Sequence, residues 1–416
     1  MARFAYNLAL FLLLPFILLR LALRARRQSE YADHVGERFG SYPFAARRPV
    51  IWLHAVSVGE TRAAQPLVAQ LLDRYPDHEI VLTHMTPTGR ATSGELFGQR
   101  VQRCYLPYDY PFAVRRFLRH FRPRIGLILE TELWPNLVAG CKAAGIPLLL
   151  VNARLSEKSA RGYARLPRLT RDALQSLTMI AAQTEADTER LRGLGAKEVA
   201  TLGNMKFDLV PPQQQIETGH ALRRLTGERP VLLCASTRDG EEALILDALP
   251  GRLHAEVLLV IVPRHPQRFE EVARLIADRG FPMQRRSANV PVAGASRIFL
   301  GDSMGEMYAY YTACDVAFVG GSLLPLGGQN LIEACAVGKP VLVGPHTFNF
   351  TEATVQAIAA GAALRVNSAP QMLAEAKRLL ADAGVRGRMG EAGLTFAARH
   401  RGATRRTMDL VAGYLK

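Results

Sequence analysis

GDSMGEMYAYYTACDVAFVGGSLLPLGGQNLIEACAVGKPVLVGP, residues 301–345, is the stretch of sequence that decides the fold. Its apolar run 315–319 ends on a glycine pair, as a buried strand does where it meets a turn. A second glycine pair precedes Asn330, which can cap a helix that ends near Gly338, and the apolar residues 341–343 predict a further strand. This order of strand, loop, helix and strand predicts a βαβ crossover in a parallel sheet.

The same stretch is also a candidate phosphate site. A strand end, a glycine loop and a helix N-terminus present unpaired backbone N–H groups and the positive end of a helix dipole, both of which suit a phosphate. An ordinary βαβ crossover carries similar glycines, so the glycines alone favour neither interpretation.

Strands and helices alternate on both sides of this stretch, which predicts parallel sheets covered by helices on both faces. We therefore expect an α/β protein with two Rossmann-like domains that face a central cleft, with ligands at the carboxyl ends of the strands. The strands are expected at 50–55, 79–84, 101–106, 124–129, 147–151, 179–182, 198–202, 231–235, 257–262 and 296–300, and the clearest helices at 60–75, from 89, 111–121 and 135–144.

The N-terminus predicts a membrane anchor. Residues 4–23 read FAYNLALFLLLPFILLRLAL, about the 20 apolar residues that a bilayer span needs. Arg24 and Arg26 follow where a signal peptide would have a small-residue cleavage site, and Arg3 alone precedes the segment, so the remainder is expected in the cytoplasm. A monotopic hairpin or an interfacial helix is the alternative.

Length and composition agree with a membrane-bound protein of two domains. The 416 residues carry a net charge of +15, which suits solubility or an anionic partner, and the anchor makes an acidic lipid surface a better partner than nucleic acid. Five scattered cysteines without a C-x-x-C pair favour buried thiols over disulfides or a zinc site. We expect an anchor with its basic flank at 1–27, an N-terminal domain at 28–203, a linker at 204–229 and a C-terminal domain at 230–416, whose last helix is able to pack back on the N-terminal domain.

Helix 111–122 alternates apolar residues with arginines. One core face and one solvated face is the usual reading of this pattern. Beside a membrane anchor, an acidic lipid head group is the alternative ligand.

Polar residues at strand ends are candidates for chemistry in the first half. Glu60 either complements a helix dipole, worth ~0.3–1 kcal/mol, or acts as a general base. Glu130, Glu132 and Trp134 follow the fourth strand, where they make poor core material, and Lys206 follows the seventh.

In the second half, three residues are candidates for ligand contacts. Ser236 follows a strand, where it can bond a phosphate. Arg264, between two prolines with His265, either grips a phosphate as a fork or forms a surface salt bridge. Glu333 either accepts from ribose hydroxyls or lies on a solvated helix face. No P-loop, G-x-G-x-x-G, H-E-x-x-H or G-x-S-x-G motif is present, and the lack of Asp-x-Asp argues against a required metal.

Taken together, nine motifs resemble the 3-deoxy-D-manno-octulosonic acid (Kdo) transferase family over essentially the full length. They are WLHAVSVGE (52–60), TPTGR (86–90), ETELWPNL (130–137), NARLSEKSARGY (152–163), GNMKFD (203–208), ASTRDGEE (235–242), PRHPQRF (263–269), GDSMGEMYAYYTACDVAFVGGS (301–322) and GGQNLIEACAVGKPVLVGP (327–345). The resemblance implies an inverting GT-B glycosyltransferase that needs no metal or other cofactor. It would move Kdo from CMP-Kdo to a lipid A precursor, lipid IVA, at the cytoplasmic face of the bacterial inner membrane, in lipopolysaccharide biosynthesis.

The resemblance also implies residue roles. Glu60 would be the general base, and Glu130 and Lys206 would stabilise the transition state. A GT-B transferase that uses a UDP-sugar and another lipid-linked acceptor is the alternative enzyme, and a membrane-bound scaffold without catalysis is the alternative outside enzymes. The residues implied in CMP binding are Pro263, Arg264, Met304, Gly305, Glu306, Asn330, Leu331, Ile332 and Glu333.

Overall fold

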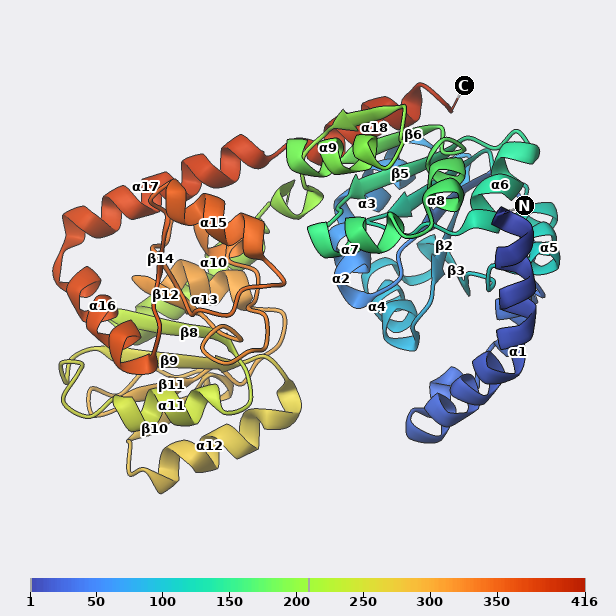
Figure 1. The fold of residues 1–416 in the computed structure, drawn as a ribbon. Helices are drawn as coiled ribbons and strands as arrows, with labels where there is room; N and C mark the ends of the chain where they lie inside the picture. The colour runs from blue at the N-terminus through green and yellow to red at the C-terminus, as the bar shows by residue number, and fades with distance from the viewer. Residues whose placement is uncertain (1, 209, 416) are drawn as a thin grey trace. The chain divides into compact units, whose positions relative to one another are not determined.

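The computed structural model describes residues 2–208 and 210–415, in two compact units (Figure 1). The first unit consists of Met1–Asp208 with Arg401–Lys416, and the second of Leu209–His400. Each unit contains a seven-stranded sheet in which every pairing is parallel.

The sheet of the first unit has the order β3-β2-β1-β4-β5-β6-β7. Strand order reverses between β1 and β4, so the loops after these two strands meet at the edge where doubly wound sheets bind ligands. The strands are β1 Val50–His54, β2 Glu79–His84, β3 Gln102–Tyr105, β4 Ile125–Leu129, β5 Leu148–Ala153, β6 Met179–Ala182 and β7 Val199–Thr201.

Both faces of this sheet are buried, as the continuous apolar runs of its strands require. Val50 and Trp52 point to one face, which α5 (Pro111–Phe121) and α6 (Pro135–Ala143) cover. Ile51 and Leu53 point to the other, which α3 (Gln65–Arg74) and α18 (Ala403–Ala412) cover. The further helices of the unit are α2 Val58–Ala63, α4 Pro87–Phe97, α7 Glu157–Tyr163, α8 Pro167–Leu174 and α9 Glu185–Gly193, with 3-10 turns at Ser29–Tyr31, Val35–Phe39, Gly98–Arg100 and Met205–Asp208.

The second sheet has the order β10-β11-β9-β8-β12-β13-β14, with its reversal between β8 and β12. Strands β10 and β14 escaped prediction because three residues that include a charge give no apolar run. The strands are β8 Val231–Thr237, β9 Leu258–Pro263, β10 Met283–Arg285, β11 Ile298–Leu300, β12 Val316–Val319, β13 Val341–Val343 and β14 Ala363–Arg365. The helices are α10 Gln213–Thr226, α11 Glu241–Ala248, α12 Phe269–Asp278, α13 Met307–Ala313, α14 Ile332–Ala336, α15 Thr351–Ala359, α16 Ala369–Ala381 and α17 Ala383–His400, with 3-10 turns at Pro266–Arg268 and Arg286–Ala288.

The segment 204–229, expected as the interdomain linker, is mostly helical. Most of it is α10, a helix of the second unit that packs closely on α13: a Cβ on Gly219 would lie 2.5 Å from Cβ of Thr312. Arg223 of α10 also pairs with Asp315 at 3.1 Å. The polar sequence of this segment therefore belongs to a half-exposed helix.

Two further comparisons with the predicted helices concern the segment 60–75 and the last helix. The helix expected at 60–75 is divided into α2 and α3, and Pro66 lies in the first turn of α3, where a proline is tolerated. The last helix, α18, belongs to the first unit, where Asp208 accepts hydrogen bonds from the backbone N–H groups of Gly402 and Thr404.

Helix α1 (Ala2–Arg27) is the one helix of the described residues that is long and apolar enough to cross a membrane. Its first half is attached to the first unit, beside α5 and α6 (Figure 1). The Tyr6 hydroxyl donates to Asp109 at 3.0 Å, and Asn136 donates to Asn7 Oδ1 at 2.6 Å. The hydroxyl of Tyr110 donates to the carbonyl of Leu10 at 2.8 Å.

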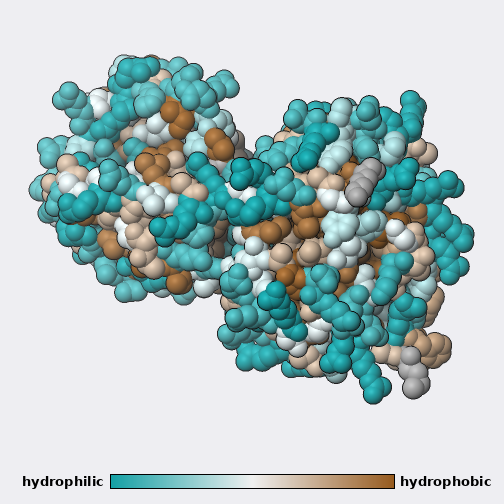
Figure 2. Space-filling model, turned by 90° about the horizontal axis from the view of Figure 1, so that it is seen from above, coloured by the Kyte–Doolittle hydropathy of each residue, from teal (hydrophilic) through white to brown (hydrophobic). Residues whose placement is uncertain are grey.

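The five cysteines are free and buried, which confirms the expectation of core thiols. Hydrophilic side chains cover most of the face shown in Figure 2, with hydrophobic groups confined to patches between them.

Candidate active site

Glu60 lies at the carboxyl end of β1, within the first turn of α2. Ser57 Oγ donates to one carboxylate oxygen at 3.0 Å, and the backbone N–H of Val56 donates to the other at 2.7 Å. Ser57 also caps α2, since its hydroxyl accepts from the N–H of Glu60. The sequence Ser57-Val-Gly-Glu60 thus forms a variant of the capping box: Ser57 caps α2, and the Glu60 carboxylate reaches back to the N–H of Val56, one residue before the cap.

Burial, helped by the nearby carboxylate of Glu130, raises the pKa of Glu60 to about 7, although the hydrogen bonds from Val56 and Ser57 lower it. A carboxylate with this pKa is half ionised near neutral pH. It can therefore take a proton from a substrate and release it to water afterwards, as a general base does.

Glu130 and Lys206 form an ion pair at the same edge, after β4 and after β7. Lys206 Nζ lies 3.2 Å from Glu130 Oε1, and each side chain is about a quarter exposed, at 23% and 26%. Glu130 has a φ of 55°, a left-handed conformation that costs a non-glycine residue energy and is frequent at functional sites. The ammonium group of Lys206 is thus fixed at the sheet edge and is still accessible to a ligand.

Asn152, near the end of β5, positions the segment that carries Lys206. Its side chain accepts from the N–H of Met205 at 3.0 Å, and its carbonyl accepts from Gln183 at 2.9 Å. Sequence reasoning missed this role. The available signal was a polar residue in an otherwise apolar strand, which calls for a buried partner.

Glu132 adds a third carboxylate. Burial raises its pKa to about 7, and the charge of Glu130 contributes. The carboxylate of Glu130 therefore raises the pKa of both Glu60 and Glu132. Lys206 is paired with this same carboxylate.

In the second unit, arginines gather where β8 and β9 end. Pro263 is the last residue of β9, and the backbone N–H of Arg264 donates to the carbonyl of Thr237 at 2.9 Å. His265 lies beside Arg238, Arg264 and Arg268; partial burial lowers its pKa and these guanidinium groups lower it further.

Arg268 is held in place by carboxylates. It pairs with buried Glu242 at 2.8 Å and with Glu271 at 2.9 Å, and Thr237 also donates to Glu242 at 2.7 Å. Ser236 adopts a left-handed φ of 54° at an irregularity of the β8 pairing. The edge thus presents the guanidinium groups of Arg238 and Arg264 beside the already paired Arg268, on fixed backbone, which suits an anion.

Residues 304–306 follow β11 and lie at the same edge. Glu306 accepts from Arg286 at 3.1 Å and from Ser303 at 2.6 Å, while Met304 is 54% exposed. Gly305 has a φ of 77°, and its carbonyl accepts from Gln215 of α10 at 2.6 Å. The turn is therefore fixed from both sides.

Residues 330–333 form the entry to α14, which begins at Ile332 rather than at the predicted cap. Asn330 Oδ1 accepts from the N–H of Ile332 at 3.1 Å, and its amide donates to Glu333 at 3.2 Å. Leu331 and Ile332 are buried, so ligand contacts here would come from Asn330, Glu333 and the backbone.

The prediction of unpaired N–H groups in the first glycine loop is wrong. Buried Glu241 accepts from the N–H groups of Gly321, Ser322 and Leu323 at 2.5, 2.9 and 2.9 Å, and from that of Arg238 at 2.9 Å. A protein carboxylate occupies the place expected for a phosphate. The hydrogen bonds of Glu241 therefore connect the loop after β12 to the segment that follows β8.

The chain matches the model of a family described as 3-deoxy-D-manno-octulosonic-acid transferase (kdotransferase) over residues 33–209. A 3-deoxy-D-manno-octulosonic acid transferase of Bordetella pertussis is 47% identical to it over all of both chains. The chain belongs to the Kdo transferase family. A second member, from Haemophilus influenzae, is 38% identical over 100% of this chain and 99% of its own. The Kdo transferase is thus a glycosyltransferase of lipopolysaccharide biosynthesis.

Solved structures support the fold of this Kdo transferase. A glycosyltransferase of Rickettsia africae matches with a TM-score of 0.59 at 15% identity, over 89% of this chain and 99% of its own. An Anabaena protein, HepE, solved in complex with UDP, matches with a TM-score of 0.57 at 13% identity, over 88% of this chain and 100% of its own. At these identities the likeness shows the fold alone, which confirms the expected GT-B arrangement of two parallel sheets.

The predicted residues of the Kdo transferase therefore fall into two groups. Glu60, Glu130 and Lys206 share the carboxyl edge of the first sheet. Of the nine residues implied in nucleotide binding, Pro263 ends β9 and the other eight follow β9, β11 and β12, at the carboxyl edge of the second sheet.

Proposed function

We propose that the enzyme transfers Kdo from CMP-Kdo to a lipid A precursor, lipid IVA, with inversion at the anomeric carbon and without a metal or other cofactor. The family supplies the transferred sugar. The donor nucleotide, the acceptor, the stereochemistry and the roles of single residues are the parts that we propose.

The carboxylate of Glu60 is the observation that carries this proposal. It is tied to its own helix turn by Val56 and Ser57, and its pKa lies at about 7. A merely structural capping-box glutamate on the surface would keep an ordinary pKa. A partly buried one beside a second carboxylate is suited to proton transfer.

In the proposed reaction, a hydroxyl of the acceptor loses its proton to Glu60 as its oxygen attacks the anomeric carbon of Kdo. The bond from that carbon to the phosphate oxygen breaks, and CMP leaves with the electron pair. Since there is one displacement and no covalent intermediate, the configuration inverts. The ion pair of Lys206 and Glu130 supplies fixed charges for the transition state.

The basic edge of the second unit suits the nucleotide. Arg264 can hold the phosphate as a fork, and Asn330 and Glu333 offer hydrogen-bonding groups for the ribose. Pro263 and the fixed turn 304–306 would shape the pocket for the base. CMP is a good leaving group, so cationic stabilisation of its phosphate suffices without a general acid.

We also propose that α1 attaches the enzyme to the bacterial inner membrane, with both units on the cytoplasmic side. The side chains of Phe4, Leu12 and Phe16 are 74%, 73% and 61% exposed. A run of large apolar side chains left open in this way on one helix is suited to contact with lipid.

Replacement of Glu60 by glutamine tests the mechanism, since it keeps the shape and removes the base. We expect transfer from CMP-Kdo to fall by at least about 10²-fold, while CMP still raises the melting temperature of the variant. Full activity of Glu60→Gln would refute the role. The matched control is Glu95→Gln, a glutamate of α4 in the same unit.

Nucleotide choice tests the donor. We expect CMP, and not UDP, to stabilise the enzyme by mass action. Stabilisation by UDP alone would instead support the UDP-sugar alternative. Undiminished transfer in the presence of a chelator is expected, and loss of transfer that Mg²⁺ restores would contradict a metal-free reaction.

A further inference from the structure

The first unit contains a second candidate binding site, a cavity of about 1150 Å³ between α5 and α6. Its lining also includes Val50, the first residue of β1, together with Arg124 and Ile146, which lie just before β4 and β5. In a parallel sheet these positions mark the amino edge, whereas Glu60 follows β1 at the carboxyl edge. The cavity is therefore separate from the candidate active site.

The charge of this cavity is of one sign. Among the described residues, seven arginines and His120 line it, and none of the lining residues is an aspartate or a glutamate. Arg48 is paired with Glu79 at 3.8 Å. Within the described part of the chain, Arg115, Arg119 and Arg124 take part in no ion pair, and all three are exposed. The rim thus offers several guanidinium groups to one anion.

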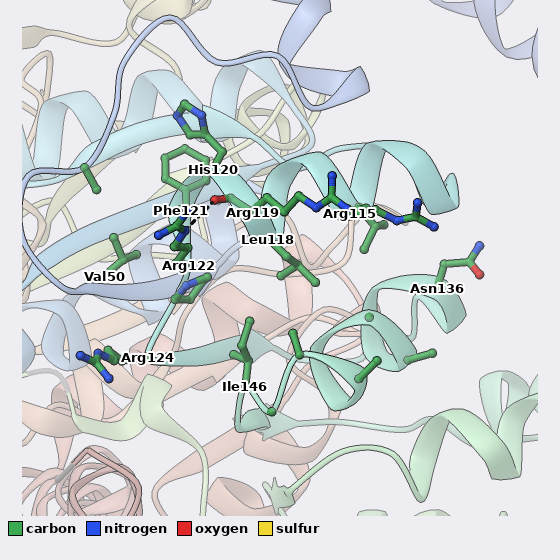
Figure 3. Close-up of a pocket in the computed structure, with 18 of the residues that line it drawn as sticks. Val50, Arg115, Leu118, Arg119, His120, Phe121, Arg122, Arg124, Asn136 and Ile146 are labelled. Carbon is green, nitrogen blue, oxygen red and sulfur yellow. Dashed lines mark hydrogen bonds between the residues drawn. The ribbon is translucent and has the colours of Figure 1, made fainter.

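The wall of the cavity is apolar. Val114 and Leu118 of α5 form it together with Ile146, and the small residues of α6 leave the space open. A Cβ on Gly140 would lie 3.0 Å from Val114, so a larger residue would close the gap between the helices. Figure 3 shows Arg115 and Arg119 along one side and Ile146 on the other. The cationic rim and the apolar wall together are suited to bind an amphiphile with an anionic head group.

Helix α1 indicates which amphiphile this is. Arg3 and Asn7 of α1 line the same cavity, and Tyr6 and Asn7 bond this part of the helix to the first unit. The apolar side chains that α1 leaves exposed begin at Phe4, next to this lining. A lipid surface in contact with α1 would therefore place its head groups at the mouth of the cavity.

The attachment of α1 to the first unit also affects how this helix can contact the membrane. A span needs about 20 residues free to enter the hydrocarbon, yet the hydrogen bonds of Tyr6, Asn7 and Leu10 attach residues 6–10 of α1 to the first unit. The remaining residues include Arg20 and end in a basic flank. This arrangement favours an interfacial helix over a spanning one.

We propose that the cavity lined by α1, α5 and α6 binds the phosphate head group of an anionic membrane phospholipid, and that it holds the enzyme at the membrane surface with α1 in the interface. Guanidinium groups bind phosphate in pairs of parallel hydrogen bonds, and the apolar wall receives the first carbons of an acyl chain. This site is independent of the proposed donor and acceptor.

Vesicle binding by the full chain tests the proposal. The probe is phosphatidylcholine vesicles with and without phosphatidylglycerol. We expect the triple variant Arg115→Gln, Arg119→Gln and Arg124→Gln to lose roughly a hundredfold in partition to the anionic vesicles, since each basic residue contributes at a charged surface. Binding to neutral vesicles, which depends on α1, should stay unchanged.

The matched control removes three exposed arginines of the second unit, Arg252, Arg274 and Arg388. An equal loss in this control would mean that only net charge matters and would overturn the proposal. The lysine triple variant at 115, 119 and 124 should recover most of the binding, which a misfolded variant could not do. Kdo transfer measured in detergent should be unaffected in all of these variants. The test of the lipid site is therefore separate from the test of the proposed reaction.

Two competing ligands have their own outcomes. Inorganic phosphate that binds as tightly as the vesicles, measured by calorimetry, would make the cavity a site for free phosphate and overturn the proposal. Binding of an oligonucleotide that the glutamine triple variant loses, with vesicle binding retained, would make it a nucleic-acid site and overturn the proposal as well.

Discussion

At the scale of single residues, Glu60 shows how local structure sets a pKa. Its carboxylate accepts from Val56 N–H and from Ser57 Oγ, which favour the ionised form, while burial and Glu130 favour the protonated form. The net result is a pKa of about 7, above the ordinary value of 4.5. Because the folded state holds this proton more tightly, ionisation of Glu60 lowers stability as the pH rises from about 4.5 through about 7.

The first prediction concerns the pH dependence of transfer. A base with this pKa gives kcat/KM an ascending limb centred near pH 7. Replacement of Ser57 by alanine removes a donor to the carboxylate, so the pKa of Glu60 should rise and the limb should move to higher pH. Activity at pH 7 should fall and recover in more alkaline buffer.

Ser57→Thr is the matched control, since threonine keeps the hydroxyl; its limb should stay in place. Both the pH profile and stability need measurement, because loss of the cap costs about 1 kcal/mol in its own right. A Ser57→Ala enzyme that is slower by the same factor at every pH would show that the hydroxyl acts only on the helix.

The second prediction concerns Glu241, the buried carboxylate that four backbone N–H groups contact. Its replacement by alanine should destabilise the second unit by about 3–5 kcal/mol, because those donors would remain buried without an acceptor. Urea unfolding measures this loss. Glu271→Ala, which removes an exposed partner of Arg268, should change stability by less than about 1 kcal/mol.

At the scale of elements, α1 and α6 are coupled through Asp109. The carboxylate accepts from Asn136 N–H at 2.9 Å, from Leu137 N–H at 2.8 Å and from Tyr6 at 3.0 Å. It therefore caps α6 and holds α1 at the same time. Burial raises the pKa of Asp109 to about 6, in spite of these hydrogen bonds.

The third prediction is that Tyr6→Phe loosens the start of α1 without unfolding the first unit. One hydrogen bond to a carboxylate is lost, worth about 1.5–3 kcal/mol. Hydrogen exchange of the amides in the first three turns of α1 should accelerate, while exchange in β1 should not change. Tyr31→Phe, just beyond the helix, serves as control. Unchanged exchange in α1 of the Tyr6 variant would show that the helix docks by its apolar contacts alone.

The elements themselves were largely predictable. The strands at 50–55, 79–84 and 124–129 were found from apolar runs, since a strand buried on both faces needs one. The helix α10 was taken for a linker because its Pro211-Pro212 start and glutamines hide a half-exposed helix. The three-residue strands β10 and β14 are too short to leave a pattern.

At the scale of the whole molecule, the two units have separate cores. One buried cluster lies around β8 and β9, and the two clusters of the first unit lie on the faces of the other sheet. The chain crosses between the units near Asp208 and again near Arg401. Such units are expected to unfold in separate steps.

The fourth prediction follows from these separate cores. Calorimetry should resolve two transitions, and CMP should raise the temperature of only one, because it binds the second unit in our proposal. A ligand at 100 times its Kd contributes about 2.7 kcal/mol to that unit. A single transition, or an equal shift of both, would contradict independent units.

The sequence by itself determined the α/β class, the two sheets, the family and the strand ends at which polar residues gather, because these depend on short-range periodicity and on motifs read in order. Only the tertiary structure decided which groups meet: Asn152 with Met205, Glu241 with Ser322, and Tyr6 with Asp109, at separations of 53, 81 and 103 residues. It also revealed that the first glycine loop is filled by Glu241 and that a basic cavity lies at the amino edge of the first sheet. The physical reason is that strand order and helix packing bring distant residues together, and no local pattern carries that information.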